Sequence, residues 1–485
     1  MLFNSLPFFF SFLLFFLFYF FSNTKNQNRL LFLFGILFYS YWNWKMSFLL
    51  LFSITANYFW AISPVRTRSP KLFLVAGLVF NLGLLSFFKY LGFFSEVFKD
   101  LLQIFSVQKS FSTFSILLPV GISFYTFHNI SYLVEIYYRR IEPTKNFISF
   151  AVYDLFFPLL LSGPIERPNS LLPQIENKRI LTQEKFLEGL LLFSFGVFKK
   201  AVISDSIAPY VDQVLNPNTN LESVSIYFTA LLFAVQIYTD FSGYSDCARG
   251  LAKMIGFELM LNFQIPFLSS NPVDFWRRWH MSLSSWLRDY LYIPLGGNRI
   301  SEWKQYRNVI LVWFLGGLWH GATYGYTLWG IYCGLQIILY LVFKKYVLTK
   351  LFPDVSSANV NVSPEPTERI LSFGRSILGA LGTLLTVSVF AHGLLLFRVE
   401  NFSHLQRLVQ GYSFAIHQPI FILKILFLVL PVAILEILQV VRKSPDFTFF
   451  LKENLLIRVC SFTFFGLLYC FFSVMEKHEF FYFQF

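Results

Sequence analysis

An apolar run of the sequence, residues 308–322 (NVILVWFLGGLWHGA), contains a single ionisable side chain, that of His320. A run of this kind is expected inside a membrane, where an ionisable group is costly to bury and is more often functional than incidental. A neutral imidazole is also the usual general base near neutral pH. We therefore expect His320 to be functional. The alternative is a structural histidine whose ring nitrogens are satisfied by neighbouring helices.

The composition indicates a membrane protein. Of the 485 residues 55% are hydrophobic and only 14% are charged, and 65 are phenylalanines, which is too apolar for a soluble globular protein. The formal charge of +12 is explained by an excess of cationic residues on cytoplasmic loops. Because these residues occur singly or in pairs and form no continuous stripe, nucleic acid is not an expected partner. The sequence predicts an all-α, multi-pass protein of the inner or plasma membrane, in contact with the lipid bilayer.

The apolar runs predict about eleven transmembrane helices plus re-entrant and interfacial helices around a central tunnel, in a single domain over residues 1–485. Runs 150–163 and 308–319 are short and are expected as half-helices or re-entrant pieces. Residues 352–368, rich in Pro, Ser and Asn, are expected to form a loop. Residues 247–309 are too long for a connection and are crowded with Trp and Arg, so we expect an embedded or interfacial catalytic substructure there. The candidate spans are near 1–22, 30–45, 47–63, 72–94, 116–137, 150–163, 187–203, 225–243, 308–319, 326–343, 371–397, 420–441 and 456–474.

The four cysteines, Cys247, Cys333, Cys460 and Cys470, have no metal-ligand spacing. We assign them no chemistry and expect no metal site. We also expect no bound cofactor.

Residues 271–299 (NPVDFWRRWHMSLSSWLRDYLYIPLGGNR) combine helical periodicity with many Trp and Arg residues. Asp274 is predicted to cap a helix that continues to Tyr292 and that Pro294 ends. Such a composition is typical of an amphipathic helix lying in the membrane interface. The functional alternative is that three guanidinium groups bind the phosphates of an acyl donor, a role that their fork geometry favours. These groups belong to Arg277, Arg278 and Arg288.

Several segments, in order along nearly the whole chain, resemble the membrane-bound O-acyltransferase family, and in particular its alginate O-acetyltransferase branch. The resemblance is carried by residues 118–127 (LPVGISFYTF), 130–132 (ISY), 162–165 (SGPI), 240–246 (DFSGYSD), 274–280 (DFWRRWH), 286–299 (WLRDYLYIPLGGNR), 317–322 (GLWHGA) and 481–485 (FYFQF). The chain departs from the expected pattern at His128 and Glu135, and in the long loop 352–368.

The resemblance implies an acyltransferase that moves an acyl group, commonly acetyl, from a cytoplasmic thioester such as acetyl-CoA to hydroxyls of an exported polysaccharide. The transfer would be direct or would pass through a separate extracytoplasmic transferase. The family's catalytic histidine corresponds to His320, and a second candidate, placed towards the cytoplasmic side of the same tunnel, corresponds to His280. A neutral imidazole that accepts the proton of the attacking hydroxyl agrees with this chemistry.

Because the donor is cytoplasmic and the acceptor is outside, we expect both histidines to border one continuous cavity with few polar groups in its walls. Trp276 or Trp279 is expected near the donor end. Asn271 or Tyr244 is expected deeper in the cavity. His128 and His392 are weaker candidates that a structural role explains equally well. The carboxylates of Asp240 and Asp246 could orient a histidine or cap a helix, and capping is the expected role.

Three alternatives remain open at this point. A secondary transporter would also have intramembrane polar residues, although the sequence has no matched pair of interrupted helices in its two halves. A catalytically silent scaffold is the second alternative. The third, within the enzymes, is a D-alanyl transferase that acts on teichoic acid-type polymers and takes its donor from an acylated carrier protein.

Overall fold

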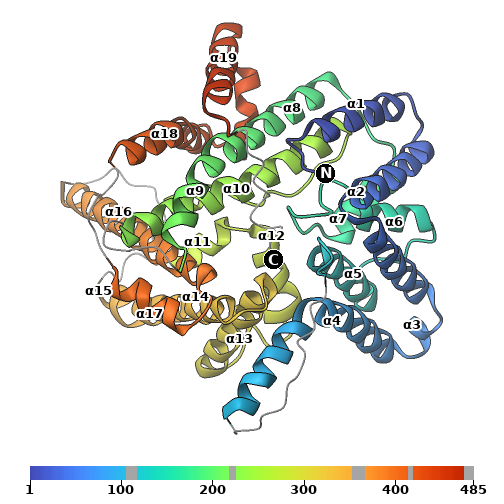
Figure 1. Cartoon of the computed structure of the whole chain (residues 1–485), viewed down its shortest axis with the longest axis horizontal. Coiled ribbons are helices and arrows are strands. Elements are labelled where there is room, and N and C mark those ends of the chain that lie inside the picture. The colour runs from blue at the N-terminus through green and yellow to red at the C-terminus, as the bar shows by residue number, and fades with distance from the viewer. Residues whose placement is uncertain (105–116, 218–224, 352–365, 413–418, 475–485) are drawn as a thin grey trace. The chain divides into compact units, whose positions relative to one another are not determined.

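The computed structural model describes residues 1–104, 117–217, 225–351, 366–412 and 419–474, and all regular elements in these ranges are helices (Figure 1). The predicted all-α class is therefore confirmed for the described residues. Most of the predicted loop 352–368 and the closing residues 481–485 lie outside them. The helices are α1 (Leu6–Phe20), α2 (Thr24–Ile62), α3 (Val65–Arg68), α4 (Pro70–Ile104), α5 (Ile122–Tyr137), α6 (Phe147–Leu155), α7 (Pro168–Glu176), α8 (Gln183–Phe198), α9 (Asp205–Val214), α10 (Ile226–Met254), α11 (Pro272–Arg278), α12 (Met281–Leu287), α13 (Glu302–His320), α14 (Tyr324–Phe343), α15 (Thr349–Leu351), α16 (Pro366–Leu394), α17 (Phe402–Gln410), α18 (Pro419–Val441) and α19 (Leu455–Phe472).

Six helices in the described part of the chain are long and apolar enough to cross a membrane, which makes the protein a multi-pass membrane protein. Other runs that the sequence counts as spans are too short or too polar by this measure. The expected spans 30–45 and 47–63 both lie on α2, whose helical backbone is broken only at Asn43. The six candidate spans are Thr24–Ile62, Pro70–Ser95, Tyr324–Leu348, Ile377–Arg398, Pro419–Val441 and Leu455–Phe472.

The chain forms two compact units, which we describe separately. The first contains Met1–Ser206, Ile237–Leu261 and the described residues from Lys424 onward, and the second contains Ile207–Gln236 and Asn262–Leu423. The core of the first unit is built from phenylalanine rings of α1 and α2 that surround Phe157. The rings of Phe15 and Phe34 lie 4.6 Å apart, and those of Phe34 and Phe157 lie 4.9 Å apart. Phenylalanine is thus used here for core packing and not only for contact with lipid.

Helix α6 covers the first part of residues 150–163, where the sequence predicts a half-helix or re-entrant piece. It has nine residues, of which Ser149 to Leu155 are all buried. Its end lies so close to α2 that a Cβ atom on Gly35 would be 2.3 Å from the carbonyl oxygen of Leu155. A short helix of this kind is tolerated at membrane depth because surrounding protein covers its backbone.

Within the first unit, helix α8 and the later part of α10 pack through two pairs of glycines. A Cβ atom on Gly189 would lie 2.5 Å from the carbonyl oxygen of Gly250, and one on Gly196 would lie 2.4 Å from that of Gly243. Small residues at such positions allow helix backbones to approach closely, as in many membrane helix pairs. A larger side chain at any of these four positions would separate the two helices.

Next to these glycines, buried lysines pair with aspartates of α10. Lys199 and Lys200 lie at the start of a π-helical segment, η1 (Lys199–Ser204). The Nζ atom of Lys199 lies 2.5 Å from Asp246, and that of Lys200 lies 2.7 Å from Asp240. Since α10 runs from Ile226 to Met254, both aspartates lie inside the helix. The prediction that they cap helices is therefore wrong, and their carboxylates instead neutralise cations of a neighbouring segment.

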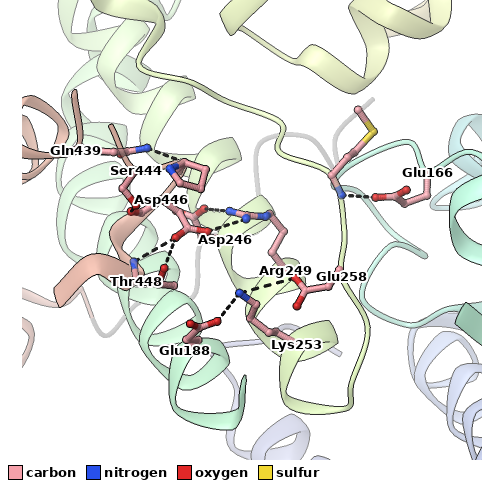
Figure 2. Close-up of polar contacts among 12 residues, drawn as sticks. Glu166, Glu188, Asp246, Arg249, Lys253, Glu258, Gln439, Ser444, Asp446 and Thr448 are labelled. Atoms are coloured by element: carbon pink, nitrogen blue, oxygen red, sulfur yellow. Dashed lines mark hydrogen bonds and ion pairs between the residues drawn. The ribbon is translucent and has the colours of Figure 1, made fainter. Parts of the chain in front are cut away.

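Helix α10 is also held to the C-terminal part of the first unit by a buried ion pair. Nη2 of Arg249 lies 2.8 Å from Oδ2 of Asp446, with relative side-chain exposures of 10% and 7% (Figure 2). Asp446 also accepts hydrogen bonds from the backbone N–H and the hydroxyl of Thr448. The contact joins residues almost two hundred positions apart in the sequence.

We expect replacement of Arg249 by Met to lower the free energy of unfolding by about 3 kcal/mol, because Asp446 would be left as a buried charge without its guanidinium partner. The measurement is thermal unfolding of the purified protein in detergent. Arg66 pairs with Glu142 at 2.8 Å, but the Glu142 side chain is 83% exposed, so Arg66→Gln should cost less than about 1 kcal/mol. Equal losses for the two variants would contradict the assignment.

The second unit is organised around α13 and α14, which pack side by side (Figure 1). A Cβ atom on Gly317 would lie 2.3 Å from the carbonyl oxygen of Tyr326, and one on Gly330 would lie 2.3 Å from that of Trp313. Helix α13 has 19 residues, about 28 Å of helix, and is longer than the half-helix expected at 308–319. The helix begins at Glu302 and includes residues 302–308, a more polar segment that precedes the apolar run.

The single helix expected from Asp274 to Tyr292 is instead divided. Helix α11 ends at Arg278 and α12 begins at Met281. The N-cap of α11 is Asn271, whose side chain accepts a hydrogen bond from the backbone N–H of Asp274 at 2.9 Å. The prediction that Asp274 is the cap is therefore wrong. The break between the two helices falls at Trp279 and His280, so the chain changes direction at the second candidate histidine. A π-helical segment, η4 (Arg288–Tyr292), follows α12 and stops before Pro294 as expected.

Candidate functional site

His320 is the last residue of α13 and is only 4% exposed. Aromatic rings surround its imidazole. The ring centroids of Trp319, Trp329 and Phe397 lie 4.8, 4.9 and 5.3 Å from that of His320. After His320 the chain leaves the helix through Gly321, whose φ of −175° is extended. His320 is thus held in an apolar environment at a helix end, from which its side chain reaches the inside of the second unit.

His280 lies at the break between α11 and α12 and is 2% exposed. Its backbone has a φ of 44°, in the left-handed region that residues other than glycine rarely adopt. Such a conformation costs about 1–3 kcal/mol and is found mainly where the surrounding structure enforces it, often at active sites. Here the carbonyl oxygen of Asn262 enforces it by accepting the N–H of Met281 at 2.9 Å.

The side chain of Asn262 sets the tautomer of His280. Its Oδ1 atom accepts the backbone N–H of Ser282 at 3.3 Å and the Ser282 hydroxyl at 2.9 Å, so this atom acts as an acceptor. Nδ1 of His280 lies 3.1 Å from the same oxygen and must therefore carry the proton that it donates. Nε2 is then the basic nitrogen. Burial lowers the pKa of His280 to about 3, so its imidazole is neutral near pH 7.

The two histidines share one small cavity, which we call the histidine cavity. Its volume is about 10 Å³, room for about one water molecule. The walls are almost entirely apolar, and indole rings dominate them. The residues that line it are Trp276, Trp279, His280, Leu283, Ser284, Leu287, Trp313, Gly316, His320 and Trp329. The expectation that both histidines border the same space, with few polar groups around it, agrees with this arrangement.

A larger cleft, which we call the arginine cleft, adjoins the histidine cavity. Its volume of about 490 Å³ lies in the range typical of small-molecule sites. Two cations, Arg277 and Arg288, line it together with polar side chains that include Ser285, Asn298 and Gln305. Four residues line both spaces and form the wall between them, namely Trp276, Ser284, Leu287 and Trp313.

Helix α13 orders these spaces along its length. Gln305, Val309 and Val312 face the arginine cleft, Trp313 faces both spaces, and Gly316 and His320 face the histidine cavity. A ligand whose charged end lies in the cleft could therefore extend along α13 towards the histidines. The space beside His320 is small, and the described residues do not form the one continuous cavity, from donor to acceptor side, that the sequence predicts.

Six of the nine predicted site residues line the histidine cavity or the arginine cleft, and three do not. Trp276, Trp279, His280 and His320 line the histidine cavity, and Trp276, Arg277 and Arg288 line the arginine cleft. The other three lie elsewhere. Nε of Arg278 pairs with Oδ2 of Asp274 at 3.0 Å, and Asn271 caps α11. Tyr244 lies in the core of the first unit, where its hydroxyl donates to the carbonyl oxygen of Pro158 at 3.4 Å.

Sequence reasoning missed several residues of this site, among them Asn262, Ser284, Trp313 and Gly316. Asn262 lies in an extended segment whose pattern gives no sign of a tie to His280, 18 positions later. Trp313 and Gly316 lie within the apolar run 308–322. Gly316 lies three residues after Trp313 and four before His320, and this spacing is the one sequence signal that the three share a helix face. Nothing local distinguishes Ser284 from its neighbour Ser285.

The remaining histidine candidates, His392 and His128, lie outside both spaces. Nδ1 of His392 lies 2.6 Å from the carbonyl oxygen of Ser388, and its Nε2 lies 2.7 Å from the Tyr412 hydroxyl. His128 belongs to the first unit, where Nδ1 lies 3.9 Å from Asp154. His392 thus has the hydrogen-bond partners that a structural histidine has, whereas neither ring nitrogen of the buried His128 has one among the described residues.

The fold and the site together define an integral membrane protein with a pair of buried histidines next to a cationic cleft. A model of the membrane-bound O-acyltransferase family matches residues 138–362. The chain is 38% identical over 429 residues to the probable alginate O-acetylase AlgI of Pseudomonas aeruginosa, with 86% of this chain and 76% of that protein covered. The chain thus belongs to the membrane-bound O-acyltransferase family and is an O-acyltransferase.

Two further relatives differ in the polymers that their names give. The peptidoglycan O-acetyltransferase of Helicobacter pylori is 37% identical over 380 residues, with 71% of each chain covered. The teichoic acid D-alanyltransferase of Bacillus subtilis is 28% identical over 238 residues, with 47% of this chain and 60% of that protein covered. The percentage identity is thus higher, and the aligned region longer, for the relatives named as O-acetylating enzymes than for the D-alanyltransferase.

Proposed function

We propose that this enzyme moves an acetyl group from a cytoplasmic thioester, acetyl-CoA, through the membrane to hydroxyls of an exported polysaccharide, directly or through an extracytoplasmic transferase. The observation that carries the proposal is the shared histidine cavity next to the arginine cleft. The names of the alginate and peptidoglycan relatives support a glycan acceptor. We retain about eleven membrane crossings and a through-going tunnel as part of this proposal.

In the proposed reaction the phosphates of the donor lie between Arg277 and Arg288, and its thioester reaches past Ser284 to the histidines. The imidazole of His320 accepts the proton of the acceptor hydroxyl as its oxygen attacks the thioester carbonyl. A carbon–oxygen bond forms, the carbon–sulfur bond breaks, and the proton passes to the departing thiolate. His280, neutral and fixed by Asn262, lies in the same cavity and positions the thioester. The apolar indole walls exclude bulk water, which would otherwise hydrolyse the donor.

The function is tested with purified protein in lipid vesicles, supplied with radiolabelled acetyl-CoA on the side of the arginine cleft and an oligosaccharide on the other. We expect label to appear as alkali-labile ester on the oligosaccharide, or on a purified partner transferase when one is added. A D-alanyl carrier protein is tested in parallel, because the Bacillus subtilis relative gives that alternative a basis. Solute uptake without ester formation would instead indicate a transporter, and absence of transfer from either thioester would refute the proposal.

The arginine cleft leads to a prediction about donor binding. Replacing Arg277 or Arg288 by Gln should raise the donor KM about tenfold and leave kcat nearly unchanged, because a ground-state contact to phosphate is lost. Arg278 is the matched control. It is adjacent in sequence but pairs with Asp274 and does not line the cleft. Equal changes of KM in all three variants, or no change in any, would contradict a phosphate-binding role for the cleft.

A further inference from the structure

Two consecutive glycines of α13, Gly316 and Gly317, have different surroundings. A Cβ atom on Gly317 would lie 2.3 Å from the Tyr326 carbonyl oxygen, so helix packing excludes a side chain there. A Cβ atom on Gly316 would meet only Cδ1 of Leu287, at 3.4 Å, which is ordinary van der Waals contact. Helix packing therefore explains the glycine at position 317 but not the one at position 316.

Gly316 is buried and lines the histidine cavity one helical turn before His320. Glycine destabilises a helix interior relative to alanine, so its presence at a position with room for a methyl group calls for another reason. The cavity has room for about one water molecule, with a volume of about 10 Å³. Leu287, whose Cδ1 atom a Cβ atom on Gly316 would meet, also lines this cavity, so a side chain at position 316 would lie at its wall.

We propose that Gly316 provides the space in which the methyl end of the donor's acetyl group lies next to His320, and that this space limits the acyl chain to acetyl. The inference rests on the proposed thioester transfer and adds to it the residue that determines specificity. Leu287 faces Gly316 from α12, and the indole rings of Trp313 and Trp329 line the same cavity. A longer chain would collide with these rigid walls. In an apolar pocket each additional methylene is typically discriminated by about 10- to 200-fold.

The first test is Gly316→Ala, assayed with acetyl-CoA. We expect kcat/KM for acetyl transfer to fall at least about tenfold while the amount of folded protein is maintained. Gly379→Ala is the matched control, because Gly379 is also in a helix and a Cβ atom there would meet nothing within 4 Å. This control should keep wild-type activity.

The second test enlarges the same space from the opposite side. Leu287→Ala should raise the ratio of butyryl to acetyl transfer at least about tenfold. Because Cδ1 of Leu287 is the atom that a Cβ atom on Gly316 would meet, the double variant Gly316→Ala/Leu287→Ala should recover acetyl transfer relative to Gly316→Ala alone. Structural damage would instead make the two losses add.

The outcomes separate this inference from the function on which it rests. Suppose that the wild-type protein transfers acetyl. The inference is then overturned, and the proposed function left intact, if Gly316→Ala is unaffected or if Leu287→Ala has an unchanged ratio of butyryl to acetyl transfer. Additive losses in the double variant also overturn it. Failure of the wild-type protein to use any thioester overturns both. If Gly316→Ala accumulates poorly, the ratio measured for Leu287→Ala decides alone, because a ratio does not depend on the amount of protein.

Discussion

The His320→Ala protein is expected to accumulate in membranes at the wild-type level and to lose acyl transfer by about 10²- to 10⁴-fold, the usual contribution of a general base. The side chain is 4% exposed among aromatic rings, so its removal relieves a burial cost and leaves no charge unpaired. The measurement is ester formation by purified protein in vesicles, together with the O-acetyl content of the exported glycan.

His392→Ala is the control for this experiment, because His392 has close polar partners away from the histidine cavity. It should retain most of the transfer activity. If His320→Ala is as active as His392→Ala at equal protein amounts, His320 is a structural histidine and the proposed mechanism fails.

The second large effect is expected for His280→Asn, which should lower kcat about 10²-fold with little change in protein stability. Asparagine tolerates the left-handed backbone of this position, where φ is 44°. The substitution therefore removes Nε2 from the cavity without adding backbone strain. It is thus a cleaner test than His280→Ala, in which loss of activity and destabilisation of the break between α11 and α12 would be mixed.

The pH dependence of the same variant gives an independent check. Burial lowers the pKa of His280 to about 3, so the imidazole stays neutral as the pH falls through the usual range for histidine. Loss of activity in wild-type protein between about pH 7 and pH 5 should therefore come from another group, and the profile of His280→Asn should have the same acid limb. A wild-type acid limb that disappears in His280→Asn would mean that His280 is protonated in this range.

The class of protein and the main catalytic candidates are determined by the sequence itself. An apolar run long enough to enter a membrane predicts a helix wherever it lies, because the backbone has no other partners there. For the same reason an ionisable residue such as His320 is conspicuous within it. His280, Arg277 and Arg288 could be selected from one Trp- and Arg-rich segment and from its resemblance to a family. These inferences depend on burial cost and local pattern, which a linear sequence contains.

The break at His280 was decided by tertiary structure. Helical periodicity continues through residues 274–292, but Asn262 holds the chain at His280 and Met281 through hydrogen bonds that no local pattern predicts. Arg277 and Arg278 both lie in α11, before the break, and point to different sides of that helix. Arg277 lines the cleft, whereas Arg278 pairs with Asp274 four residues earlier.

Gly316 and Gly317 differ in the same way. One faces the histidine cavity and the other packs against α14. Local sequence determines which segments are helical and how costly each residue is to bury. Which side chains share a cavity depends on contacts between distant segments, and only the folded chain brings those segments together.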